Sequence, residues 1–197
     1  MVYRINKYSA NTPRFGVLRD AFSPEEVERI KFLEKILTFT KGKVGPTQSE
    51  DDNARDSKIA FMGPNESTDW IYARLAGIIP KVNYDLFLLD IDQIEILQYT
   101  VYESTNEQHY DWHLDCHADY RDYDRKISGT LLLSDPDEYE GGELEIIVNG
   151  SPDKTEKLKP EKGHIAFFSS TFPHKVHPVT SGTRKSIVFW VLGKRES

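Results

Sequence analysis

The second half of the chain is a succession of short strand-like segments separated by turns, and this pattern restricts the possible folds more than any other feature. The segments are rich in Val, Ile, Leu and aromatic residues, and turns such as DPDEYEGG and KPEKG contain Gly and Pro. Such segments span residues 94–102, 127–134, 142–149, 164–170, 174–179 and 184–192. Many short strands joined in this way are typical of two sheets packed as a jelly roll. We therefore predict a mainly β fold with a double-stranded β-helix core over residues 92–193.

Residues 1–91 are predicted to form a helical support, with its helices packed on one sheet of that core. SPEEVERIKFLEKIL begins with Ser23 as an N-cap, Pro24 in the first turn and Glu26 three residues after the serine. This is the capping-box pattern of a helix start. STDWIYARLAGIIP predicts a second helix, and we expect Pro80 to end it because proline cannot continue the hydrogen-bond ladder.

The polar segment between the two helices is predicted to be a loop. Residues 40–57 contain glycine, proline and clustered acids. A loop of this length is often functional, so we interpret it as a mobile segment and a candidate lid over a cleft. The chain has 197 residues without an internal break, and we expect one domain over residues 1–197.

Composition argues against several classes of protein. The net charge is −7, with 25 Lys and Arg against 32 Asp and Glu, so no global positive field attracts nucleic acid. No run of about 18 apolar residues is present, and no apolar leader follows MVYRINKYSA, so we expect no membrane span and no secretory signal. The single cysteine, Cys116, excludes an internal disulfide and favours a reducing, cytoplasmic setting. The oligomeric state stays open.

Two histidines and one carboxylate form a candidate metal site. YDWHLD places His113 and Asp115 two residues apart, so on an extended strand both side chains leave the same face. A third ligand must come from elsewhere, and FPHKVHPVTSGTR offers His174 and His177. These two point to opposite faces of an extended segment, so one of them is expected to reach the metal. Two imidazoles and one carboxylate on one face of an ion are the ligand set of non-haem Fe(II) oxygenases.

The order and spacing of these residues resemble the Fe(II)/2-oxoglutarate-dependent dioxygenases, in particular the prolyl-4-hydroxylase-like branch with the PKHD-type hydroxylases. The family pattern is HxD, a long gap, a histidine and, about ten positions later within PVTxGxR, a basic residue. The matching residues are His113, Asp115, His174, Pro178, Val179, Thr180, Gly182 and Arg184. DPDEYEGGEL is similar to the family's DPDxYxGGEL element, and Trp190 follows Arg184 by six residues. The resemblance covers about half of the chain, Ile94 to Leu192, and the ordered set is specific where HxD alone is not.

The resemblance implies an oxidoreductase that uses Fe(II), 2-oxoglutarate and O2, with ascorbate as an optional reductant. It assigns the metal to His113, Asp115 and His174, with His174 preferred over His177. Arg184 is expected to clamp the distal carboxylate of 2-oxoglutarate, since a guanidinium fork matches a carboxylate.

Two further residues are candidates for the cosubstrate site. Ser186 lies two residues after Arg184 on the same strand face and is expected to add a hydroxyl donor. In the family pattern a tyrosine some ten residues before HxD contacts the 2-oxo acid, and the resemblance gives this role to Tyr102, eleven residues before His113, with an ordinary core tyrosine as the alternative.

The resemblance also bears on the reaction and the substrate. Halogenating members of the family have a small residue where this chain keeps Asp115, so hydroxylation of an unactivated C–H is implied. The branch suggests a prolyl or other amino-acyl residue in a peptide or protein, and a free amino acid or small metabolite is the alternative substrate. Tyr110, Trp112 and Trp190 are candidates for the cleft wall. A noncatalytic jelly-roll binding module and a cupin that uses iron without 2-oxoglutarate are the alternative classes.

Overall fold

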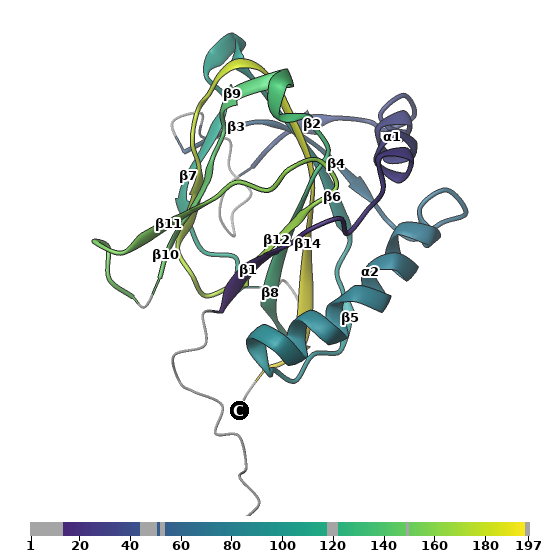
Figure 1. Cartoon of the computed structure of the whole chain (residues 1–197), viewed down its shortest axis with the longest axis vertical. Coiled ribbons are helices and arrows are strands. Elements are labelled where there is room, and N and C mark those ends of the chain that lie inside the picture. The colour runs from purple at the N-terminus through teal and green to yellow at the C-terminus, as the bar shows by residue number, and fades with distance from the viewer. Residues whose placement is uncertain (1–13, 44–50, 52–53, 118–121, 149, 196–197) are drawn as a thin grey trace, which may run out of the picture.

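Two antiparallel sheets, one large and one small, form the centre of the molecule. The computed structural model describes residues 14–43, 51, 54–117, 122–148 and 150–195 (Figure 1). In the part of the chain that is described, the major sheet has the order β1-β12-β8-β14-β6-β4-β2, and β5 and β9 also pair with β14. Its strands are β1 (Phe15–Leu18), β2 (Thr40–Lys41), β4 (Lys58–Met62), β5 (Gln93–Ile94), β6 (Leu97–Glu103), β8 (Tyr123–Leu132), β9 (Tyr139–Gly141), β12 (Ile165–Ser169) and β14 (Val179–Lys194).

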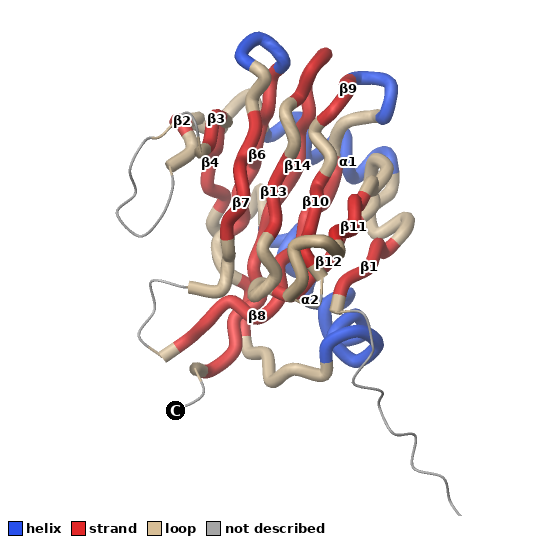
Figure 2. Tube along the Cα trace, turned by 90° about the vertical axis from the view of Figure 1, so that its left-hand side faces the viewer, coloured by secondary structure: helices blue, strands red, loops and turns tan. Residues whose placement is uncertain are grey.

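The minor sheet lies against one face of the major sheet. Its described strands have the order β11-β10-β13-β7-β3, and Figure 2 shows β7, β13 and β10 side by side. They are β3 (Arg55–Asp56), β7 (His109–His113), β10 (Leu144–Ile147), β11 (Thr155–Leu158) and β13 (His174–Val176). Two facing antiparallel sheets of short strands are the predicted jelly-roll arrangement, and the prediction of a mainly β fold is confirmed.

Two hydrophobic cores divide the molecule into layers. One core fills the space between the sheets and includes Ile146 of β10, Phe168 of β12 and Val176 of β13. The other lies between the major sheet and the helices α1 (Pro24–Leu33) and α2 (Asp69–Val82), which cover its outer face (Figure 1). Strand β6 contributes to both cores because its side chains alternate between the two faces of the sheet. Tyr99 packs under the helices and Tyr102 packs between the sheets.

The first helix begins where its capping box predicts. The Ser23 hydroxyl accepts a hydrogen bond from the backbone N–H of Glu26, and the Glu26 carboxylate accepts one from the backbone N–H of Ser23. Val27, Ile30 and Leu33 form the buried face of the helix.

The prediction that Pro80 ends the second helix is wrong. The helix runs from Asp69 to Val82, and a π-helical turn, Asn83–Phe87, follows it. The backbone N–H of Asn83 donates to the carbonyls of Ile79 and Pro80, so the ladder resumes beyond the missing donor of the proline. The chain leaves the helix at Leu88, whose φ is 54°.

The segment predicted as a loop over residues 40–57 contains two short strands. β2 pairs with β4 at the edge of the major sheet, and β3 pairs with β7 at the edge of the minor sheet. Residues 1–91 therefore supply strands to both sheets as well as the two helices. Residues 44–50 and 52–53 lie outside the described part of the chain, and the prediction of a lid falls mainly on them.

Candidate metal centre

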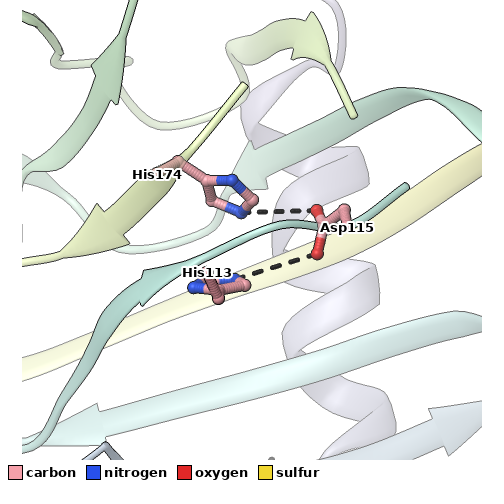
Figure 3. Close-up of side chains that lie close together, drawn as sticks. All are labelled: His113, Asp115 and His174. Atoms are coloured by element: carbon pink, nitrogen blue, oxygen red, sulfur yellow. Dashed lines mark ion pairs between the residues drawn. The ribbon is translucent and has the colours of Figure 1, made fainter. Parts of the chain in front are cut away.

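The two predicted histidine ligands face each other across neighbouring strands of the minor sheet. His113 is the last residue of β7, His174 is the first residue of β13, and the two are paired in register. Their ring centroids lie 4.0 Å apart. Asp115 lies two residues beyond the end of β7 and points toward both imidazoles (Figure 3). Strand pairing thus brings together residues that are about sixty positions apart in the chain.

The donor atoms are spaced and oriented for one shared ion. Nε2 of His174 lies 3.3 Å from Oδ2 of Asp115, and Nε2 of His113 lies 3.8 Å from Oδ1. One donor atom from each of the three residues lies within 4.8 Å of the others. Nδ1 of His113 is 2.8 Å from the Asp111 carbonyl, and Nδ1 of His174 is 3.0 Å from the Phe172 carbonyl. A carbonyl accepts only from a protonated nitrogen, so in the neutral form of either ring Nε2 is the nitrogen left to bind a metal.

Burial keeps His113 neutral. The pKa of His113 is lowered to about 3, first because burial disfavours the charged ring and second because His174 lies beside it. A neutral imidazole is the form that binds a metal. The ring is therefore in its ligand form throughout the physiological range of pH.

Asp115 is ionised and held in place. Burial by itself would raise its pKa, but His174 and His113 and the hydrogen bonds it accepts lower the pKa below the ordinary value. The Ser128 hydroxyl donates to Oδ2 at 2.8 Å and lies 2.9 Å from the Ser170 hydroxyl. The Nε1 of Trp190 is buried and has no hydrogen-bond partner among the described residues. Its N–H group nevertheless contributes to the lowered pKa of Asp115.

His177, the alternative ligand, lies on the other side of its strand. Its Nε2 is bonded to the Glu145 carboxylate, and its backbone N–H donates to the carbonyl of Glu143. The family resemblance assigned the metal to His174, and in the structure His174 lies with His113 and Asp115 while His177 does not.

Of the predicted cosubstrate residues, Tyr102 lines the cavity that the metal ligands share, whereas Arg184 and Ser186 do not. Arg184 and Ser186 are both fully buried on β14, and Nη1 of Arg184 donates to the Ser186 hydroxyl at 3.3 Å. The Cζ of Arg184 is 5.9 Å from the centre of the Tyr102 ring. Burial raises the pKa of Tyr102, and Arg55 and Arg184 oppose this increase. A Cβ at Gly142, where φ is 63°, would lie 2.7 Å from Cδ of Arg184, so the GG element leaves room for this side chain.

A cavity of about 260 Å³ opens onto the metal ligands. Tyr110 and Trp190 line it, as the sequence suggests, while Trp112 does not and is 40% exposed under Lys175. Arg55 and Arg125 also line the cavity, and sequence reasoning missed both. For Arg55 the available signal was an arginine two residues before Ser57 at the start of a strand, which places both side chains on one face.

Comparison with known proteins agrees with the geometry of the metal centre. The model of the 2OG-Fe(II) oxygenase superfamily matches residues 97–192. A PKHD-type hydroxylase of Verminephrobacter eiseniae is 32% identical over 183 residues, which are 89% of this chain and 77% of that protein. The chain belongs to the 2OG-Fe(II) oxygenase superfamily, in its PKHD-type branch. A PKHD-type hydroxylase of Prochlorococcus marinus is 51% identical over 65 residues, which span 33% of this chain and 28% of the relative.

Solved structures share the fold of this oxygenase. A prolyl-4-hydroxylase of Pseudomonas putida has a TM-score of 0.72 at 20% identity, covering 93% of this chain and 94% of that chain. A prolyl hydroxylase of Trichoplax adhaerens, solved with a hypoxia inducible factor peptide fragment, has a TM-score of 0.75 at 22% identity. The match covers 92% of this chain and 84% of that chain. Among the described residues of this oxygenase, no helix is long and apolar enough to cross a membrane.

Proposed function

We propose that this protein is a Fe(II)- and 2-oxoglutarate-dependent hydroxylase that acts on a prolyl or other amino-acyl residue of a peptide or protein. The observation that carries the proposal is the convergence of His113, Asp115 and His174 with both Nε2 atoms directed inward. Two neutral imidazoles and one carboxylate fit Fe(II) and leave coordination positions for other ligands. The named activities of the PKHD-type relatives support the reaction class.

Each residue of the centre has a distinct task in this proposal. His113, Asp115 and His174 hold the iron, which with 2-oxoglutarate and O2 supplies the oxidising chemistry. Ser128 and Ser170 fix the carboxylate of Asp115, so that the ligand geometry exists before the metal binds. Ascorbate is the proposed reductant for iron that has become oxidised.

Arg184 binds the distal carboxylate of 2-oxoglutarate. Its guanidinium is fully buried, and no carboxylate of the described residues lies within ion-pair distance of it. A buried guanidinium offers paired donors that match a carboxylate. Ser186 orients the guanidinium through their hydrogen bond, and the centre of the Tyr102 ring lies 5.9 Å from Cζ of Arg184.

The site also excludes water from the reacting atoms. The rings of Tyr110 and Phe168 pack against His113 and His174, with centroid distances of 3.4 and 4.6 Å. Such packing lowers the local dielectric and limits solvent access. The free Cys116 supports a reducing, cytoplasmic setting for the protein.

The proposal is tested by anaerobic titration of the Fe(II)-loaded protein with 2-oxoglutarate, followed by the weak visible charge-transfer band of a chelated 2-oxo acid. We expect the band in the wild type and its loss in His174→Ala. In Arg184→Ala we expect about a 10- to 100-fold weaker apparent affinity for 2-oxoglutarate, since a charged hydrogen bond contributes about 1.5–3 kcal/mol.

Lys185→Ala is the matched control for the arginine. Lys185 is the next residue, and its ammonium pairs with Glu34 on the helix-covered side of the sheet, at 2.7 Å. Its removal should leave the affinity for 2-oxoglutarate unchanged. A metal-loaded wild type without the band would contradict the assignment and would favour a noncatalytic module or an iron enzyme without 2-oxoglutarate.

A further inference from the structure

A second buried arginine, Arg55, lines the cavity onto which the metal ligands open. Arg55 belongs to β3, where it pairs in register with Tyr110 of β7. Only 7% of Arg55 is exposed, and it lines the same cavity as the three metal ligands. Its Cζ lies 4.5 Å above the Tyr110 ring, which in turn stacks on His113 at 3.4 Å with an interplanar angle of 17°. One aromatic ring therefore separates this guanidinium from a metal ligand.

The positive charge of Arg55 has no counter-ion within the described part of the chain. Its Nε donates to the Ser57 hydroxyl at 2.9 Å, and its Nη1 donates to the Lys43 carbonyl at 3.0 Å. Both acceptors are neutral. The other arginine of the cavity wall differs, because Arg125 forms a two-pronged ion pair with Glu95 at 2.6 and 2.7 Å. Burial of an unpaired charge is unfavourable, so an anion bound beside Arg55 would be stabilised.

Neither the metal nor 2-oxoglutarate accounts for this charge, if both bind as proposed above. The positive charges of Fe(II) and Arg184 together balance the negative charges of the Asp115 carboxylate and the two carboxylates of 2-oxoglutarate. Arg125 is already neutralised by Glu95. Among the described residues, nothing balances the charge on Arg55 when the metal and the cosubstrate are in place, and the molecule that remains to bind is the substrate.

We infer that Arg55 binds a carboxylate of the substrate, so that the preferred acceptor of this hydroxylase is an anionic molecule and not a neutral internal peptide segment. Nη1 and Nη2 form the fork that matches a carboxylate, and Nη2 donates to none of the described residues. The carboxylate is either the free α-carboxylate of an amino acid or C-terminal residue, or an acidic side chain. Ile59, Phe61 and Leu114 of the cavity wall provide the apolar surface on which the rest of the substrate packs.

Three probes test this inference, and the first two are matched in shape. N-acetyl-L-proline carries an α-carboxylate, N-acetyl-L-prolinamide is its neutral analogue, and N-acetyl-L-prolyl-L-glutamic acid α-amide carries its carboxylate on a side chain. Each is titrated by ligand-observed NMR into protein loaded with Zn(II), which cannot turn over, and saturated with 2-oxoglutarate. We expect at least one carboxylate probe to bind about 10- to 100-fold more tightly than the prolinamide. The probe that gains affinity identifies the source of the carboxylate.

Substitutions at Arg55 assign the preference to this side chain. In Arg55→Gln we expect the carboxylate preference to fall to about one, while Arg55→Lys, which keeps the charge, retains part of it. The affinity for 2-oxoglutarate should stay within about twofold of wild type in both variants, which also shows that the site is folded. Lys43→Gln, which removes an exposed cation from the rim, should keep the preference.

Three outcomes would overturn the inference. The first is that the carboxylate and amide probes bind the wild type equally, or that none binds. The second is that Arg55→Gln keeps the preference. The third is that Arg55→Gln weakens 2-oxoglutarate binding tenfold or more and leaves the probes unaffected, because Arg55 would then serve the cosubstrate. A wild type that fails to bind 2-oxoglutarate in the same titration contradicts the proposed function itself, so the two failures are distinguishable.

Discussion

At the residue scale, each proposed metal ligand is oriented by a hydrogen bond to a group outside the set of three ligands. Backbone carbonyls fix the tautomers of His113 and His174, and Ser128 fixes the carboxylate of Asp115. Such outer contacts hold the ligands in their binding geometry before the metal arrives. The cost is that an imidazole is buried where it cannot easily become charged.

This burial predicts a pH dependence of folding for the metal-free protein. The pKa of His113 is lowered to about 3 in the folded state, whereas the unfolded side chain takes up a proton below about pH 6.5. The unfolded state therefore binds more protons between these values. The free energy of unfolding should decrease as the pH falls from about 6.5 toward 3, by at most about 1.4 kcal/mol per pH unit from this residue.

Urea denaturation of metal-free wild type and His113→Gln across this pH range measures the effect. The variant should show a shallower decrease in the free energy of unfolding. Equal slopes in the two proteins would mean that another group causes the loss of stability in acid.

At the scale of elements, β14 connects the parts of the site. It pairs with β6, β8 and β9 and carries Arg184, Ser186 and Trp190. The 3₁₀ turn Pro136–Glu138 leads into β9, and the glycine pair at its end brings the backbone close to this strand. The DPDEYEGGEL segment is therefore a spacer that determines where the arginine can lie.

Gly142→Ala tests this role. The new methyl group would lie 2.7 Å from Cδ of Arg184 and would displace the guanidinium. We expect the affinity for 2-oxoglutarate to fall about tenfold or more, with metal binding retained because no metal ligand moves. Isothermal titration calorimetry with Zn(II) and then 2-oxoglutarate measures both affinities.

Gly150→Ala is the control for backbone strain. Gly150 also has a positive φ, 67°, but no atom lies within 4 Å of the added methyl group. A comparable loss of 2-oxoglutarate affinity in this variant would attribute the effect to the general cost of replacing a glycine and not to contact with Arg184.

At the scale of the whole molecule, two cores serve different purposes. The core under the helices stabilises the major sheet from outside, whereas the core between the sheets lies against the strands that carry the metal ligands. Ile146 of β10 pairs in register with His174 and is fully buried in the inner core, and Leu75 of α2 is equally buried in the outer one.

Ile146→Ala and Leu75→Ala should therefore differ in their effect on the site. Each removes a fully buried aliphatic side chain and should lower the free energy of unfolding by about 2–5 kcal/mol. Only Ile146→Ala should also weaken metal binding, because the cavity it leaves adjoins the strand that positions His174. Denaturant unfolding measures the loss of stability, and metal titration measures the loss of metal affinity. Equal metal affinity in both variants would contradict the prediction that only the core between the sheets supports the metal site.

Local patterns in the sequence were sufficient for much of the fold and for placing the candidate ligands His113 and Asp115 on one face, whereas His174 was assigned by the family resemblance. The capping box marked the start of α1, and the alternation of strands placed Tyr99 and Tyr102 on opposite faces. The same alternation separated His174 from His177. These features depend on residues within a few positions of one another, where backbone geometry alone sets the direction of a side chain.

Only the tertiary structure decided which distant residues share the site. The stack of Arg55 on Tyr110, the support of Asp115 by Ser128, and the ladder that continues past Pro80 have no local signature. They depend on which strands pair and in which register, and on contacts that outweigh a local preference. The physical reason is that strand pairing joins segments far apart in the chain, so a short window of sequence contains only one side of each contact.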